Sequence, residues 1–150
     1  MCLITEQKEP IITKEETIGY KVLNRDLSSI SQHFKYEYNK LYVTKIKHSS
    51  NPRYPSQKSM DYYINKYKGH VIQIKYNPDN NKIINNNVIN NNVIALGQGY
   101  HYYTSYDEAI ISFMCIERKI IVKCIIPANS EVYYDAIGNA VSNQIIIKKV

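Results

Sequence analysis

The chain has 150 residues and a mass of 17.5 kDa, a size that fits one domain with a core of its own. No run approaches the roughly 18 consecutive apolar residues of a membrane span, and the first residues lack the basic and long apolar parts of a secretory signal. Three cysteines show no CxxC spacing, which argues against a zinc ribbon or a disulfide framework. These totals indicate a protein of a reducing compartment that is not secreted and contacts no membrane.

The net charge of +6 is concentrated in the middle of the chain. Residues 33–82 hold ten basic residues against three acidic ones, and eight of the 15 tyrosines. Lys and Arg neutralise phosphates and aromatic rings stack on bases, so this block fits a face that binds nucleic acid or another polyanion. A solvated face is the competing interpretation, because the abundant Tyr, Asn, Ile and Lys share A/T-rich codons. The residues of the polyanion interpretation are Lys35, Lys40, Lys45, Lys47, Arg53, Lys58, Lys66 and Lys68.

The first element expected along the chain is a strand over 17–23, whose residues alternate and favour β structure. A short strand and turn at 34–40 and a half-buried strand at 41–47 follow it. An apolar stripe at i, i+3, i+4 and i+7 predicts a helix at about 56–68, which Gly69 ends. A strand over 70–76 comes next.

Residues 77–92 are expected to form a low-complexity loop. The sequence Asn-Asn-Asn-Val-Ile occurs twice there, and a five-residue period matches neither a helix nor a strand. So polar a segment cannot bury enough apolar area to order itself.

The stretch from Gly97 to Ala109 is the most informative part of the sequence. Two glycines allow a turn or a close backbone approach, and the β-favourable residues 100–103 follow them. Ser105 and Glu108 then form a capping box for a helix over about 105–117. Further strands are expected at 119–126, which Pro127 ends, at 131–134 and at 144–150. The sequence therefore predicts one α+β domain with a mixed, mainly antiparallel sheet and two helices.

Three pieces of the chain, taken in order, resemble a family of small proteins from phages, giant viruses and bacteria. They are Tyr20-Lys21-Val22-Leu23, then Phe34-Lys35-Tyr36-Glu37 with Lys40 and Tyr42, then Gly99-Tyr100-His101-Tyr102 with the helix, apolar strand and Ile-Pro break that follow. Members tend to contain YKV, FxYExGKxY and GFHxF, then VxCxIPxG and SxxIxI. The resemblance covers most of the chain except 48–69 and the Asn-rich segment.

This chain departs from the family pattern at two places. Tyr38-Asn39 stands where the family usually has a glycine, and Tyr100 replaces Phe. The family has no settled activity, so the resemblance implies an architecture and a phage-type or viral setting, in the host cytoplasm or a virion, and no mechanism.

A second, weaker resemblance is to ADP-ribosyltransferase-type folds, with Gly99-x-His101 and the residues from Tyr102 to Ala109 in the place of their second motif. Those enzymes usually open a late strand with a catalytic Glu, whereas Ser142-Asn143-Gln144 carries no carboxylate. The resemblance thus implies a degenerate site that binds a nucleotide without transferring it. The small-ligand residues of this interpretation are Tyr20, Gly99, His101, Tyr103 and Ser105.

No complete catalytic set is present in the sequence, and the four histidines lack HxxxH spacing, so neither a catalytic residue, a metal nor a cofactor is expected. His101 fits a hydrogen-bonded core residue as well as a ligand-binding one. The function expected first is a binding or interaction protein with a basic, Tyr-rich face for nucleic acid, another polyanion or a host or viral protein. An ADP-ribosyltransferase-like enzyme or relic and a structural virion component are the alternatives, and a homo-oligomer stays open.

Overall fold

The computed structural model describes residues 3–30, 34–48, 74–77, 82–85, 94–113 and 118–150, together with positions 58, 62, 65 and 66. All strand pairs in this part are antiparallel, and it contains one helix, α2 (Tyr106–Phe113). The protein is thus mainly an antiparallel sheet protein with little helix. The strands are β1 (Leu3–Thr5), β2 (Ile11–Ile12), β3 (Thr17–Asn24), β4 (Leu41–Val43), β5 (Lys47–His48), β6 (Ile74–Asn77), β7 (Lys82–Asn85), β8 (Ile94–Gln98), β9 (Tyr100–Tyr103), β10 (Lys119–Ile126), β11 (Glu131–Tyr134), β12 (Asn139–Ser142) and β13 (Gln144–Lys148).

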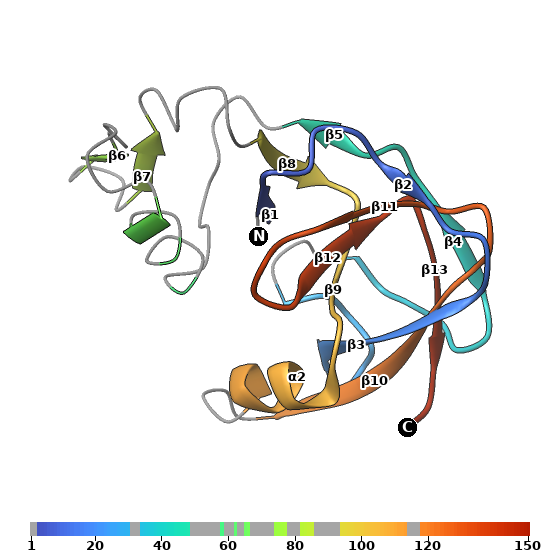
Figure 1. Ribbon diagram of the computed structural model, residues 1–150. Helices are drawn as coiled ribbons and strands as arrows, with labels where there is room; N and C mark the ends of the chain where they lie inside the picture. The colour runs from blue at the N-terminus through green and yellow to red at the C-terminus, as the bar shows by residue number, and fades with distance from the viewer. Residues whose placement is uncertain are drawn as a thin grey trace.

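Eight strands form the main sheet, in the order β2-β11-β12-β9-β3-β10-β13-β4. Buried side chains from six of them, β11 through β13, belong to one apolar cluster that includes Leu23, Tyr102, Val132 and Ile147. One face of the sheet can converge on a single cluster only if the sheet curls, as Figure 1 shows. The main sheet therefore has an inner face, which is the core, and an outer face.

A smaller sheet, in the order β1-β8-β5, covers part of the outer face (Figure 1). Its Leu3 and Leu96 pack against Tyr133 and Val141, which alternate with inward-facing neighbours on β11 and β12. The chain leaves β8 of this sheet and enters β9 of the main sheet through one residue, Gly99. A third sheet consists of β6 and β7.

The helix α2 packs on β3 and β10 (Figure 1). Ser105 caps it, because its Oγ accepts a hydrogen bond of 3.3 Å from the Glu108 backbone N–H. The second half of the expected capping box is replaced: the Glu108 carboxylate instead accepts bonds of 3.0 and 3.1 Å from Lys58 Nζ. The helix begins one residue after the predicted start, and its predicted last residues, 114–117, lie outside the described residues.

Several expectations need correction. Residues 34–40 do not form a strand but make two isolated bridges, Ser28 to Lys35 and Tyr38 to Ile147. The expected strand 41–47 is two strands in different sheets, β4 and β5, because the chain crosses between sheets over 44–46 and buries part of Ile46 beside Leu96. Strands β1, β2 and β12 were not expected.

Other expectations are met or lie outside the described residues. The strands at 17–23, 119–126, 131–134 and 144–150 are present with small differences at their ends. Of the helix expected at 56–68, only four positions are described. Within the segment expected to be a loop at 77–92, Lys82–Asn85 is a strand, and 78–81 and 86–92 lie outside the described residues.

Candidate functional site

His101 is held by backbone carbonyl groups on the outer face of β9. Its Nδ1 lies 3.2 Å from the Gly99 oxygen and its Nε2 lies 3.3 Å from the Leu96 oxygen. Burial and the nearby Lys21 ammonium lower the pKa of the imidazole to about 3, so the ring is neutral at pH 7 and donates to one of the two oxygens. His101 therefore fastens the end of β8 to β9, which is the structural role that the sequence left open.

Gly99 is where β8 gives way to β9. Its φ of +142° is rare for residues with a side chain, and a Cβ built there would lie 2.4 Å from Val141 Cγ1. The glycine is thus explained by backbone shape and by the close approach of β12.

Two other predicted ligand-binding residues, Tyr20 and Tyr103, are brought together. They are direct cross-strand partners on β3 and β9. Tyr106, the first residue of α2, packs edge-on against Tyr20 with ring centroids 5.5 Å apart, and 42% of its surface is exposed. Ser105 precedes Tyr106, with its hydroxyl used as the helix cap. Three tyrosines therefore gather where α2 begins, while the His101 ring is turned to β8.

Two lysines continue this line across the sheet. Tyr20 pairs with Lys123 on β10, and Lys123 pairs with Lys148 on β13. Cross-strand partners share a face, so Tyr103, Tyr20, Lys123 and Lys148 form one row on the outer face, which we name the Tyr–Lys row. Its tyrosines and Lys123 are half-buried, and Lys148 is exposed.

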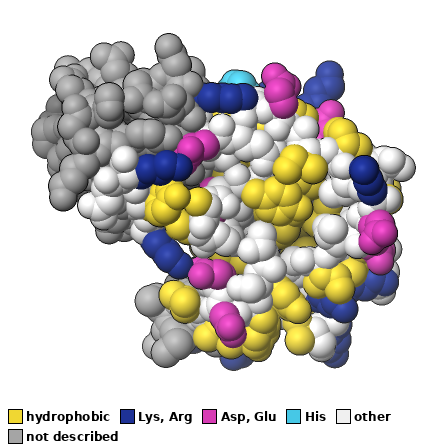
Figure 2. Space-filling model, viewed as in Figure 1, with side chains coloured by type: hydrophobic (Ala, Val, Ile, Leu, Met, Phe, Trp, Pro, Cys, Tyr) yellow, Lys and Arg dark blue, Asp and Glu magenta, His cyan; other side chains and the backbone are white. Residues whose placement is uncertain are grey.

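The two lysines lack an acidic partner. Like charges directly opposite each other destabilise a sheet, and no ion pair of the described residues includes Lys123 or Lys148. Strands β3, β10, β13 and β4 contain no Asp or Glu in their sequences. The face in Figure 2 differs, since acidic and basic side chains are interspersed there around apolar ones. The Tyr–Lys row is therefore a local excess of positive charge beside aromatic rings.

Sequence reasoning did not single out these two lysines. It followed the number of basic residues in the middle of the chain, whereas Lys123 and Lys148 belong to apolar strands that each contain only two or one. The available signal was alternation: in KIIVKCII and QIIIK the lysines fall at positions opposite in phase to the buried Cys124 and Ile147.

The predicted polyanion-binding lysines have mixed fates. Three of them form ion pairs with carboxylates: Lys40 with Glu37, Lys58 with Glu108, and Lys66 with Glu6. Lys35, Lys45 and Lys47 are exposed, and Arg53 and Lys68 lie outside the described residues. The basic middle of the chain is thus partly neutralised by acids from other segments.

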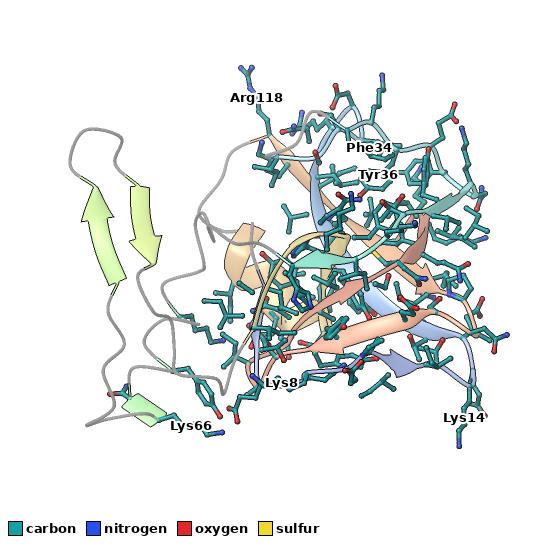
Figure 3. The ribbon with its side chains drawn as sticks, turned by 90° about the horizontal axis from the view of Figure 1, so that it is seen from above. Lys8, Lys14, Phe34, Tyr36, Lys66 and Arg118 are labelled. Atoms are coloured by element: carbon teal, nitrogen blue, oxygen red, sulfur yellow. The ribbon has the colours of Figure 1, made fainter. Side chains whose placement is uncertain are left out.

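The Phe34–Tyr42 motif forms an aromatic cluster at the inner face. The rings of Phe34, Tyr36 and Tyr42 meet edge to face with centroids 4.8 to 5.3 Å apart, and Tyr100 lies beside them. Figure 3 shows Phe34 and Tyr36 next to each other. Asn39, which stands where the resembling family has glycine, has a φ of +62°, a backbone region that glycine and asparagine adopt most readily. The motif spacing thus has a structural explanation.

Lys21 and Cys124 lie behind this cluster. Lys21 Nζ donates a hydrogen bond to the His101 carbonyl and lies 5.9 Å from the centre of the Tyr36 ring, and burial lowers the pKa of the amine. Burial raises the pKa of the Cys124 thiol to about 12, which keeps it protonated at neutral pH. Since the thiolate is the reactive form, Cys124 is not set up as a nucleophile.

The residues of the ADP-ribosyltransferase-like interpretation do not converge. Tyr20 shares a row with Lys148, and Gln144 lies four residues away along β13, which is about 13 Å at the rise of a strand. His101 turns to β8 instead. Only Tyr20, Tyr103 and Ser105 are close together, at the start of α2.

Comparison with known proteins returns no matching family model, curated protein or solved structure. Within the described residues, no group of three or more His, Cys, Asp or Glu is arranged to hold a metal ion. The helical part that the structure describes is too short to cross a membrane.

Proposed function

We propose that this chain is a binding protein that holds a polyanion on the Tyr–Lys row. The observation that supports this most is the direct opposition of Lys123 and Lys148 on strands without acidic residues. An anionic group between the two ammonium groups would replace their repulsion with two attractions. Such a face favours a partner with repeated negative charges over a neutral one.

The tyrosines at the other end of the row extend the surface. Tyr20 and Tyr103 present half-buried rings next to Lys123, and Tyr106 adds an exposed ring. Aromatic rings beside a basic strip are the combination that single-stranded nucleic acids use, by stacking and phosphate contact together. Both nucleic acid and an acidic protein segment carry the charge that the row would accept.

The proposal is tested by fluorescence anisotropy with two labelled probes, a short single-stranded oligonucleotide and poly-glutamate. We expect binding at low salt that weakens as salt rises, because each phosphate contact releases counterions. The variant Lys123→Gln/Lys148→Gln should weaken binding about tenfold or more at low salt and flatten the salt dependence by about two contacts.

The control variant removes the same charge elsewhere. Lys8 and Arg118 are exposed and lie outside the four strands, well apart from each other (Figure 3). Lys8→Gln/Arg118→Gln should therefore bind both probes nearly as well as the wild type. Absence of binding to either probe at low salt, or equal losses in the two variants, would refute a polyanion site on this row.

Nucleotide binding without transfer is a second candidate, which the gathering of Tyr20, Tyr103 and Tyr106 at the start of α2 favours. It predicts that labelled NAD binds to the wild type and not to Tyr20→Ala, while His101→Ala, whose ring faces β8, keeps binding if it stays folded. No NAD binding by the wild type rejects this candidate and leaves the polyanion proposal intact.

A further inference from the structure

A second row of side chains runs beside the Tyr–Lys row on the same face. Ile18 pairs with Ile125, Ile125 with Ile146, and Ile146 with Leu41, which gives four aliphatic residues in register across β3, β10, β13 and β4. Rows on one face are two residues apart along each strand, or about 7 Å. Ile18 and Leu41, at the two ends, are 49% and 48% exposed. We name these four residues the aliphatic row.

The aliphatic row ends at a strand edge. Strand β4 is the last strand of the main sheet, and its Val43, on the same face as Leu41, is 63% exposed. Exposed apolar edge strands are uncommon because they invite another strand to pair, and proteins usually protect them with charges or proline. Here the edge is apolar at both outward positions.

The backbone at this edge is free to pair. The Thr44 N–H donates to the carbonyl of Asn143, at 2.9 Å, which continues the register in which Tyr42 faces Ile145. Antiparallel strands alternate, so the Tyr42 backbone groups also point to β13 and those of Leu41 and Val43 point to the open side. Neither Leu41 nor Val43 makes a backbone hydrogen bond on that side to any residue that the structure describes.

The charges around the edge select the partner. Lys148 lies one row beyond Leu41, and the exposed Lys45 follows β4 at the other end. A second copy of this chain would bring these lysines and those of the Tyr–Lys row face to face without acids to balance them. A nucleic acid would satisfy the lysines, but it offers neither peptide groups to the β4 edge nor aliphatic side chains to the aliphatic row.

We infer that β4 binds an extended acidic segment of a partner protein by strand addition. The added strand places two alternate apolar side chains beside Leu41 and Val43, and acidic side chains at its ends near Lys148 and Lys45. Main-chain bonds to the edge give affinity, and the alternating side chains give specificity. The inference rests on the proposed function, since it names an acidic protein segment as the polyanion.

The test uses a labelled peptide with the core Glu-Thr-Val-Thr-Val-Thr-Glu, in which the two Glu and the two Val share one face of a strand. Three peptides serve as comparison: Glu replaced by Gln, Val replaced by Ser, and the same composition in scrambled order. We expect the parent peptide to bind about tenfold more tightly than each of the three, measured by anisotropy against the full-length chain.

Protein variants separate the contacts. Val43→Pro removes an outward N–H without removing a bond to β13, and should cost about tenfold in peptide affinity. Leu41→Thr/Val43→Thr keeps the backbone and removes the apolar contact, with a similar loss. As a control, Ile11→Thr/Ile12→Thr takes the same kind of exposed residue from β2, at the other edge of the sheet, and should bind normally.

The outcomes distinguish the two proposals. If the β4 variants weaken peptide binding and leave oligonucleotide binding unchanged, strand addition stands. If Lys123→Gln/Lys148→Gln weakens both probes and the β4 variants weaken neither, the polyanion site stands and strand addition is wrong. Strand addition is also overturned if the scrambled peptide binds equally well, or if light scattering shows that the β4 edge joins two copies of the chain.

Discussion

At the scale of single residues, Gly99 has the clearest steric requirement. Its φ of +142° and the 2.4 Å between its hypothetical Cβ and Val141 Cγ1 act together. We expect Gly99→Ala to lower the free energy of unfolding by about 2 to 4 kcal/mol, from backbone strain and overpacking combined. Urea unfolding followed by circular dichroism measures this loss.

The variant Val141→Ala separates these two causes. It removes the methyl groups that a Cβ at position 99 would meet, so Gly99→Ala should cost less in that background, leaving only the backbone term. Equal costs in both backgrounds would mean that the contact with Val141 is unimportant.

His101 links stability to pH. Its pKa is about 3 in the folded protein, against an ordinary value near 6.5, so below pH 6.5 the unfolded chain takes up a proton that the folded chain does not. The contribution of His101 is therefore full above pH 6.5 and declines by up to about 1.4 kcal/mol per pH unit between pH 6 and 4. Compared with His101→Gln, the wild type should lose more unfolding free energy over this range. Parallel curves for the two proteins would contradict the burial of a neutral ring.

At the scale of elements, β13 shows how alternation divides one strand between two environments. Ile145 and Ile147 are fully buried in the inner cluster, and Ile146 lies in the aliphatic row on the outer face. We expect Ile145→Ala and Ile147→Ala to cost about 2 to 5 kcal/mol each, and Ile146→Ala about 1.5 kcal/mol or less, because less apolar area is lost. Chemical denaturation of the three variants gives the comparison. A larger loss for Ile146→Ala would mean that the strand register is displaced by one residue.

The elements that sequence analysis recovered are those with a strong local signal. Strand β10 is eight residues long, apolar and followed by Pro127, and β3 and β13 alternate clearly. Strands β1 and β2 have three and two residues, too few to show a period, and they exist because β8 and β11 supply partners from far along the chain. Pairing of that kind leaves no local trace in the sequence.

The same limit applies to the candidate site. The sequence pointed to Tyr20 and Tyr103, which the fold does bring together, and to His101, whose ring turns to a strand that local patterns do not place beside it. The opposition of Lys123 and Lys148 depends on the register between β10 and β13, which is fixed by inner-face packing of Cys124 against Ile147. A long-range register cannot be read from either strand alone.

At the scale of the whole molecule, the early strands depend on the late ones. Strand β1 pairs with β8, β2 with β11, and β3 with β9 and β10. A chain that stops after Arg118 keeps β3 but lacks β10 and β13, the strands that complete its inner face. We expect such a chain to show neither a cooperative urea transition nor native circular dichroism, and a cooperative transition would show that the described core can form without these strands.

The dependence of β3 on β10 has a consequence for synthesis in the cell. Asn24 leaves the ribosome about a hundred residues before Ile126, its strand's last partner residue, is made. At roughly 5 to 20 residues per second, β3 waits about 5 to 20 s with Val22 and Leu23 unprotected. The stretch Thr17–Asn24 is therefore a natural binding site for a chaperone that guards nascent chains, and slow translation lengthens the period in which such help is needed.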